Sequence, residues 1–210
     1  MINLYDAVSL SKRKRVAIFI LIITMWCLII YVFHQNPEHS LFLSMKISGI
    51  LLSFILTWMM MDMTHPFEMM IRSYKGNSYL IFYKWLSVII WSFVFTLSTS
   101  LMITFYALLS HQEGLLVQYY KLPIHLFLDL LMIGGFVMMI SKIKHPTLAL
   151  LTPLFYTTYQ LFIENQTSLY LYYLFPFFQP MILDFKLAIS YKLCYISLGL
   201  LITNFPRQNN

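Results

Sequence analysis

Long apolar runs, nearly free of charge and separated by short polar segments, make up most of the chain. Six of these runs have the roughly 17–25 residues that a helix needs to cross a bilayer. They cover residues 16–33, 41–61, 85–109, 124–140, 147–163 and 187–205. The pattern therefore predicts an all-α integral membrane protein, with six transmembrane helices in a single transmembrane domain over residues 1–210.

The first run has an alternative interpretation as a signal peptide, because the basic sequence KRKR at 12–15 precedes it. The run is longer than a usual signal-peptide core, however. The polar turn HQNPEHS at 34–40 also offers no small-residue cleavage site. We therefore expect residues 16–33 to be a retained first span.

The composition excludes an ordinary soluble domain. Hydrophobic residues make up 60% of the chain and charged residues only 10%, with a mean hydropathy of +0.72. A soluble domain carries about 25% charged residues. The net charge of +6 comes from basic residues that flank the apolar runs, which is not the pattern of a nucleic-acid-binding surface. The two cysteines lie inside apolar runs and predict neither a disulfide nor a zinc site.

The basic residues predict how the chain is oriented. If the N-terminus is cytoplasmic, ten of the fourteen Lys and Arg residues, including every arginine, fall on the cytoplasmic side. The other four are Lys46, Lys121, Lys186 and Lys192. We therefore expect a multi-pass protein of a prokaryotic cell membrane, with both termini in the cytoplasm.

An amphipathic segment separates the second and third apolar runs. Its sequence predicts a short surface helix over residues 64–76, ended by Gly76-Asn77, and Lys84 and Trp85 then follow as interface anchors. One face of this helix is apolar and another is charged. The residues concerned are Phe67, Met70, Ile71 and Tyr74 on the first face, and Glu68, Arg72 and Lys75 on the second. The alternative is a connector that binds no partner.

The aromatic segment at residues 169–184 is interrupted by Pro176 and Pro180. Two prolines four residues apart argue against a straight membrane-crossing helix. A re-entrant hairpin, which enters the membrane from outside and returns to the same side, fits this segment better.

This layout resembles the membrane subunit of ABC exporters of the type-2 permease class. The stretch HPFEMMIRSYKGNSYLIFYKWL resembles the coupling region between spans two and three, and YLYYLFPFFQPMILDF resembles the exit hairpin between spans five and six. The resemblance covers nearly the whole chain in layout, although at 210 residues the chain is shorter than is usual for the class. It implies a homodimer or heterodimer with a second permease subunit. It also implies coupling through residues 64–76 to a separate ATPase, and a hydrophobic or amphipathic substrate such as a peptide, a lipid or a drug.

The absence of certain sequence motifs agrees with a permease subunit that works with a separate ATPase. The chain contains no GxxxxGK[ST] motif, so ATP is expected on the partner subunit and no cofactor on this chain. The six histidines do not stand at ligand spacing on one element, and no metal site is expected. A membrane enzyme is a weaker alternative, because Asp62 and His65 lack a third partner. A non-transporting accessory or immunity protein is the other alternative.

Four ionisable residues lie inside the predicted spans, where charge is costly and often functional. Lys46, Asp129 and Lys192 each stand about five residues from the outer end of a span, and His125 precedes Asp129 by one helical turn. These residues could form a polar girdle that closes the outer end of a translocation path, with Asp129 paired to either lysine. In the simpler interpretation, the lysines extend to the headgroups and Asp129 makes only a packing contact.

Overall fold

The computed structural model describes six stretches of the chain: residues 12–35, 40–61, 76–109, 121–141, 146–162 and 185–204. Each stretch is helical, and no strand occurs in them. The helices are α2 (Lys12–Gln35), α3 (Ser40–Met61), α5 (Asn77–Leu109), α7 (Leu122–Ser141), α8 (Leu151–Phe162, preceded by the 3₁₀ helix η1, Pro146–Leu150) and α10 (Phe185–Asn204). The predicted all-α class is confirmed for the described residues.

Four of these helices are long and apolar enough to cross a membrane. The qualifying stretches are Leu43–Met60, Ser78–Leu109, Leu122–Ile140 and Lys186–Thr203. Helix α2 contributes a shorter apolar stretch, Val16–Val32. All six apolar runs of the sequence coincide with helices, and the chain is a helical membrane protein.

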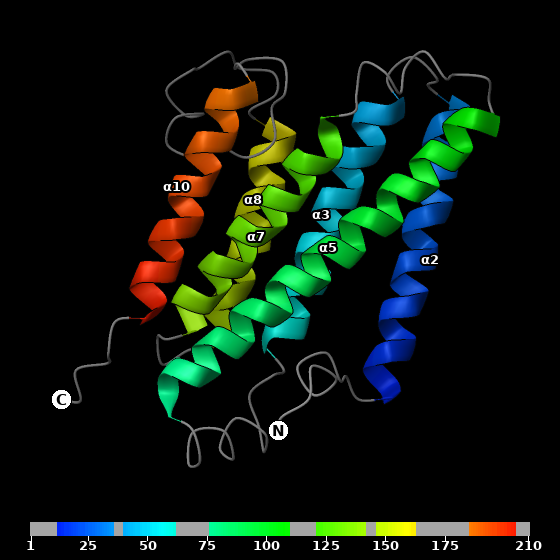
Figure 1. Cartoon of the computed structure of the whole chain (residues 1–210). Helices are drawn as coiled ribbons and strands as arrows, with labels where there is room; N and C mark the ends of the chain where they lie inside the picture. The colour runs from blue at the N-terminus through cyan, green and yellow to red at the C-terminus, as the bar shows by residue number, and fades with distance from the viewer. Residues whose placement is uncertain are drawn as a thin grey trace.

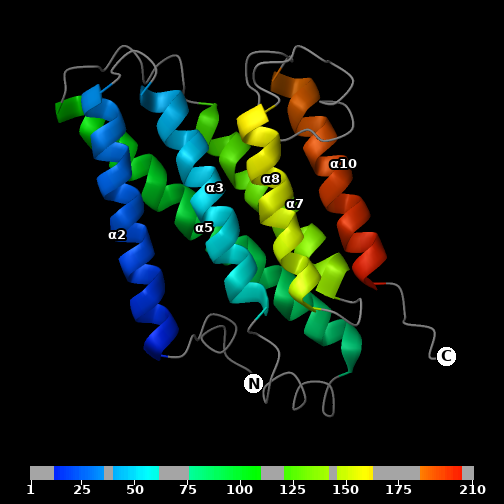
Figure 2. The same cartoon turned by 180° about the vertical axis from the view of Figure 1, so that it is seen from behind.

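Consecutive helices run in alternating directions through one bundle (Figure 1). As a result, the starts of α2, α5 and η1 lie at the same end of the bundle as the ends of α3, α7 and α10. Helix α7 is central and packs against α3, α5 and α10, while α2 packs mainly on α3 (Figures 1 and 2). The end of the bundle at which α5 begins is called the α5-start end below.

Helix α5 crosses the bundle diagonally (Figure 1). Its 33 residues span about 50 Å at 1.5 Å per residue, whereas the hydrocarbon core of a bilayer is about 30 Å thick. A helix this long fits by tilting. The helix begins before the span predicted from residue 85: α5 starts at Asn77, and its first turns bury Leu80 and Tyr83. Gly76, immediately before it, has the left-handed φ of 84° that its sequence context predicts.

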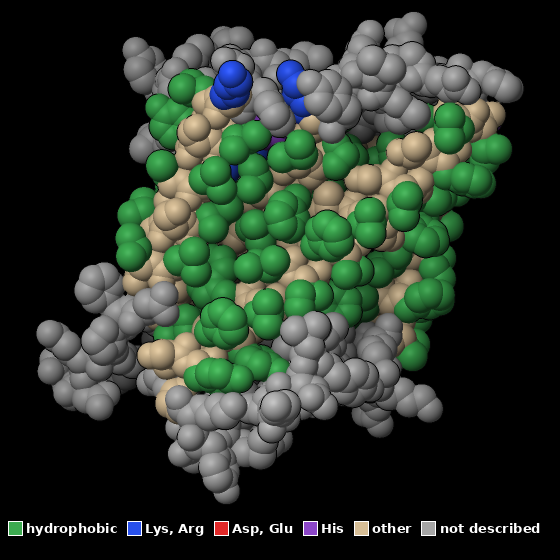
Figure 3. All heavy atoms as spheres, viewed as in Figure 1, with side chains coloured by type: hydrophobic (Ala, Val, Ile, Leu, Met, Phe, Trp, Pro, Cys, Tyr) green, Lys and Arg blue, Asp and Glu red, His purple; other side chains and the backbone are tan. Residues whose placement is uncertain are grey.

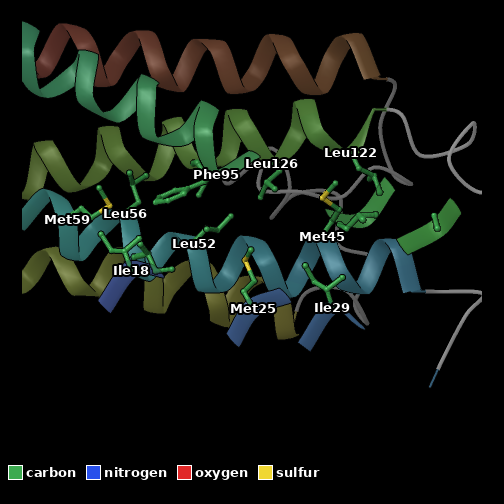
Figure 4. Close-up of a cluster of buried hydrophobic side chains, with 14 residues drawn as sticks. Ile18, Met25, Ile29, Met45, Leu52, Leu56, Met59, Phe95, Leu122 and Leu126 are labelled. Atoms are coloured by element: carbon green, nitrogen blue, oxygen red, sulfur yellow. The ribbon is translucent and has the colours of Figure 1, made fainter. Parts of the chain in front are cut away.

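The core lies where α2, α3, α5 and α7 meet (Figure 4). Helix α2 contributes a single face to it, through Ile18, Met25 and Ile29, each at most 5% exposed. The opposite face of α2 exposes Ile20 and Tyr31. Figure 3 shows hydrophobic side chains over most of the described surface in that view, with lysine atoms visible in its upper part. This outer apolar surface suits contact with lipid.

The fifth predicted span, residues 147–163, is divided between η1 and α8. Both parts start next to a proline: Pro146 begins η1, and Pro153 lies in the first turn of α8, where its missing N–H would have no helical partner. The two parts together bury Ala149, Thr152 and Tyr156 against the bundle. The span therefore enters the bundle as a tighter 3₁₀ turn before it continues as an α-helix.

The alternating helix directions predict which connections share a side of the membrane. Single cysteines at Asn77 and Lys142 are expected to react with an impermeant maleimide from one side. Cysteines at Asn36, Glu113 and Gln166 are expected to react from the other side. The measurement is labelling of intact cells compared with labelling of opened vesicles.

The native Cys27 and Cys194 are exposed, so both are first replaced by serine. Labelling of position 166 from the same side as position 142 would contradict the arrangement, because α8 would then not cross the membrane.

Candidate functional site

Four polar side chains from three helices meet inside the bundle, and we refer to them as the Asp129 cluster. Lys192 of α10 places its Nζ 2.6 Å from Asp129 Oδ1 of α7, and both side chains are fully buried. The same Nζ lies 3.2 Å from His125 Nδ1, one turn earlier on α7. Tyr156 of α8 donates a hydrogen bond of 3.4 Å to Asp129 Oδ2. The cluster therefore joins α7, α8 and α10.

The geometry assigns a role to each group. The ammonium form of Lys192 can only donate, and it then requires a His125 Nδ1 that accepts, which is the neutral tautomer protonated on Nε2. The carboxylate of Asp129 receives the ammonium on one oxygen and the phenol of Tyr156 on the other. Each buried charge thus has a partner of opposite sign, and this pairing offsets part of the cost of removing both from water.

The sequence left open whether Lys46 or Lys192 pairs with Asp129, and the structure shows that Lys192 makes the ion pair. Lys46 is buried near the start of α3. The simpler expectation, that the lysines extend to the headgroups, does not fit Lys192, whose ammonium group lies in the buried ion pair. Lys46 is 6% exposed.

Helix α8 contributes a polar face that the sequence analysis missed. Thr152, Tyr156 and Gln160 recur every four residues and are all buried. Four-residue spacing puts side chains on one face of a helix, so this pattern inside an apolar span was the available signal. A Cβ atom added at Gly49 of α3 would lie 2.7 Å from the Tyr156 hydroxyl. The glycine therefore lets the tyrosine lie directly against the α3 backbone.

A second polar contact lies closer to the α5-start end, and we refer to it as the Trp85 joint. The indole Nε1 of Trp85 donates to Thr203 Oγ1 of α10 at 3.0 Å. The indole ring also lies against Gly135 of α7, where an added Cβ would be 3.0 Å from its Cη2 atom. The interpretation of Trp85 as an interface anchor is wrong, because its side chain is 4% exposed and packs between α7 and α10.

Several predicted site residues lie outside the described residues. These are the proposed coupling residues Phe67, Glu68, Met70, Ile71, Arg72, Tyr74 and Lys75, and the hairpin prolines Pro176 and Pro180. Within the described stretches, no three His, Cys, Asp or Glu side chains come together in a way that could hold a metal ion.

Comparison of the chain with protein-family models, with curated proteins and with solved structures finds no match. The Asp129 cluster and the Trp85 joint are accordingly interpreted from their own geometry.

The buried ion pair generates a prediction about stability. Lys192→Met keeps a long apolar stem but leaves the carboxylate of Asp129 buried without its ammonium partner. Breaking a buried pair in this way costs about 3–5 kcal/mol. We expect a clear fall in the thermal unfolding midpoint of the detergent-purified protein.

The matched control is Lys186→Met, which removes an exposed lysine from the same helix. The double change Lys192→Met with Asp129→Leu removes both charges and should recover part of the lost stability. Equal midpoints for Lys192→Met and Lys186→Met would contradict a stabilising ion pair.

The contact between Gly49 and Tyr156 generates a second prediction. Gly49→Ala places a methyl group against the tyrosine hydroxyl, and overpacking of this kind costs about 1–3 kcal/mol. Tyr156→Phe removes the hydroxyl oxygen, so Gly49→Ala should destabilise the protein much less when residue 156 is phenylalanine. The measurement is a double-mutant cycle on the unfolding midpoint, and strictly additive shifts would show that the two residues do not meet.

Proposed function

We propose that this protein is the membrane subunit of an ABC exporter of the type-2 permease class. The observation that carries the proposal is the arrangement around residues 62–76. Helix α3 ends and α5 starts at the same end of the bundle at which α2 starts and α10 ends (Figure 1). A docking segment in this position would lie on the side of the membrane that bears most of the chain's arginines and lysines.

The early start of α5 also supports this role. The helix begins directly after Gly76 and continues without a break to Leu109. A displacement of the segment before Gly76 would therefore be applied to a continuous helix about 50 Å long. A permease needs such a connection between the face that binds the ATPase and the membrane interior.

In this proposal the chain has six membrane spans and both termini in the cytoplasm. Residues 64–76 form the coupling helix, and residues 169–184 form a re-entrant exit hairpin on the outer side. ATP is hydrolysed on a separate subunit, because this chain contains no phosphate-binding GxxxxGK[ST] motif. A second permease subunit, identical or homologous, completes the transporter.

The Asp129 cluster and Lys46 then have a place in the transport path. Both belong to the outer half of the membrane in the proposed orientation, and Lys192 follows the exit hairpin closely in the sequence. Paired charges at this level would form the polar girdle that closes the path when no substrate passes. The substrate would be hydrophobic or amphipathic, such as a peptide, a lipid or a drug, in keeping with the apolar side chains of the bundle.

The coupling helix is tested through its proposed anchor. We expect Phe67→Ala to reduce association with the ATPase that purifies with this chain from its native cells, because a buried aromatic residue often contributes most to an interface. The double change Glu68→Ala with Arg72→Ala should also weaken association. Truncating one partner of a desolvated charge pair costs about 2–5 kcal/mol. Co-purification and ATP hydrolysis by the complex are the measurements.

The matched control is Phe82→Ala, an exposed phenylalanine on the second turn of α5, outside the coupling segment. All variants should insert normally. If Phe67→Ala and the charge variant behave like Phe82→Ala, residues 64–76 are only a connector, and the permease proposal loses its basis.

A further inference from the structure

We propose that Trp85 is a positioning residue that transmits a displacement of the coupling segment to α7 and α10. The inference rests on the proposed function and adds the route by which the ATPase would act on the outer half of the bundle. It follows from three sets of contacts: those of Trp85 itself, those between α7 and α10, and those of α5 beyond Trp85.

Trp85 lies nine residues after Gly76, about 13 Å along α5. Its Nε1 donates to Thr203 Oγ1 at 3.0 Å, and the Thr203 hydroxyl in turn donates to Gly199 O of the same helix at 2.8 Å. The indole ring fills the space that the missing side chains of Gly135 and Gly199 leave open. One side chain of α5 is thus held by both α7 and α10.

Helices α7 and α10 are themselves joined at two levels. Near the Trp85 joint, a Cβ added at Gly199 would be 3.8 Å from Gly135 Cα, so the two backbones approach closely. The ion pair between Asp129 and Lys192 joins them again, six residues away along α7 or about 9 Å. Because contacts at both levels would have to break for the helices to separate, we treat the two helices as one unit.

Beyond Trp85, α5 continues to pack on this unit through α7. A Cβ added at Gly134 would overlap Val88, one turn after Trp85. Further along, Phe93 meets Phe127 of α7 edge-on, and Phe95 and Ile103 belong to the core shared with α2, α3 and α7. Helix α5 therefore contacts α7 along much of its length, whereas its hydrogen bond to α10 lies near its start, at Trp85. Packed contacts of this kind can carry energetic coupling, and Trp85 is the residue of α5 that packs on α7 and also hydrogen-bonds to α10.

Two variants remove the hydrogen bond of the joint from opposite sides. Trp85→Phe removes the indole N–H and keeps an aromatic ring, whereas Thr203→Val removes the acceptor and keeps the side-chain shape. The matched control is Trp91→Phe on the same helix, because the Trp91 Nε1 is buried with no hydrogen-bond partner among the described residues. All three variants are made in the full chain with Cys27 and Cys194 replaced by serine.

The readout is the distance between spin labels at Tyr31→Cys on α2 and Leu187→Cys on α10. Both positions are exposed and lie at the end of the bundle opposite the α5-start end. The distance is measured in the complex with the co-purifying ATPase, without nucleotide and with ATP. We expect ATP to change this spin-label distance in the protein with Trp85 and Thr203 unchanged, and also in the Trp91→Phe variant. Trp85→Phe and Thr203→Val should lose most of this shift while still binding the ATPase and hydrolysing ATP.

If Trp85→Phe and Thr203→Val keep the full shift, the role of Trp85 is overturned and the proposed function stands. A bound, active ATPase that produces no shift in the unmodified joint would also overturn the inference. If no ATPase co-purifies at all, the proposed function fails first, and the inference fails with it.

Discussion

A charge inside a membrane protein must be paired, and the Asp129–Lys192 ion pair satisfies this requirement at the centre of the fold. An isolated Lys or Asp at the middle of a membrane helix costs roughly 2.5–3.5 kcal/mol on insertion scales. Here Asp129 and Lys192 are fully buried, 2.6 Å apart, on α7 and α10. The pair fixes the register of these helices, because sliding either one by a turn would separate the charges. His125 and Tyr156 depend on the same register for their own partners.

Small residues allow the other helices to approach α7 closely. In lipid, helix association depends on packing and polar contacts, and small side chains are favoured where helices cross. Gly134 and Gly135 face Val88 and Trp85 of α5, while Gly199 brings α10 against the same ring. Gly49 of α3 gives the Tyr156 hydroxyl its space. Glycine thus allows close helix contacts at these positions, beside a core of large apolar side chains such as Leu52, Leu56 and Phe95.

The helices could be predicted from the sequence because each is an apolar run of membrane-crossing length. The start of α5 could not, because Tyr79, Tyr83 and Lys84 resemble an interface and yet continue the helix that begins at Asn77. Asp129 could be identified as a paired residue because charge in a span is costly. Choosing Lys192 over Lys46 required knowing which helices are neighbours. Trp85 was misinterpreted for the same reason, since its burial depends on two distant glycines, Gly135 and Gly199.

The positions of the two polar contacts suggest a division of roles within the bundle. Helix α10 packs almost entirely on α7, and much of its remaining surface is exposed, as at Leu198 and Leu201. Polar contacts add to the packing of α10 on α7, among them the ion pair at Lys192 and the hydrogen bond at Thr203. Because the hydrogen bond at Thr203 comes from Trp85 of α5, α10 is joined to α5 as well as to α7. A helix with much of its surface exposed is thus held from two sides, by α7 and by the start of α5.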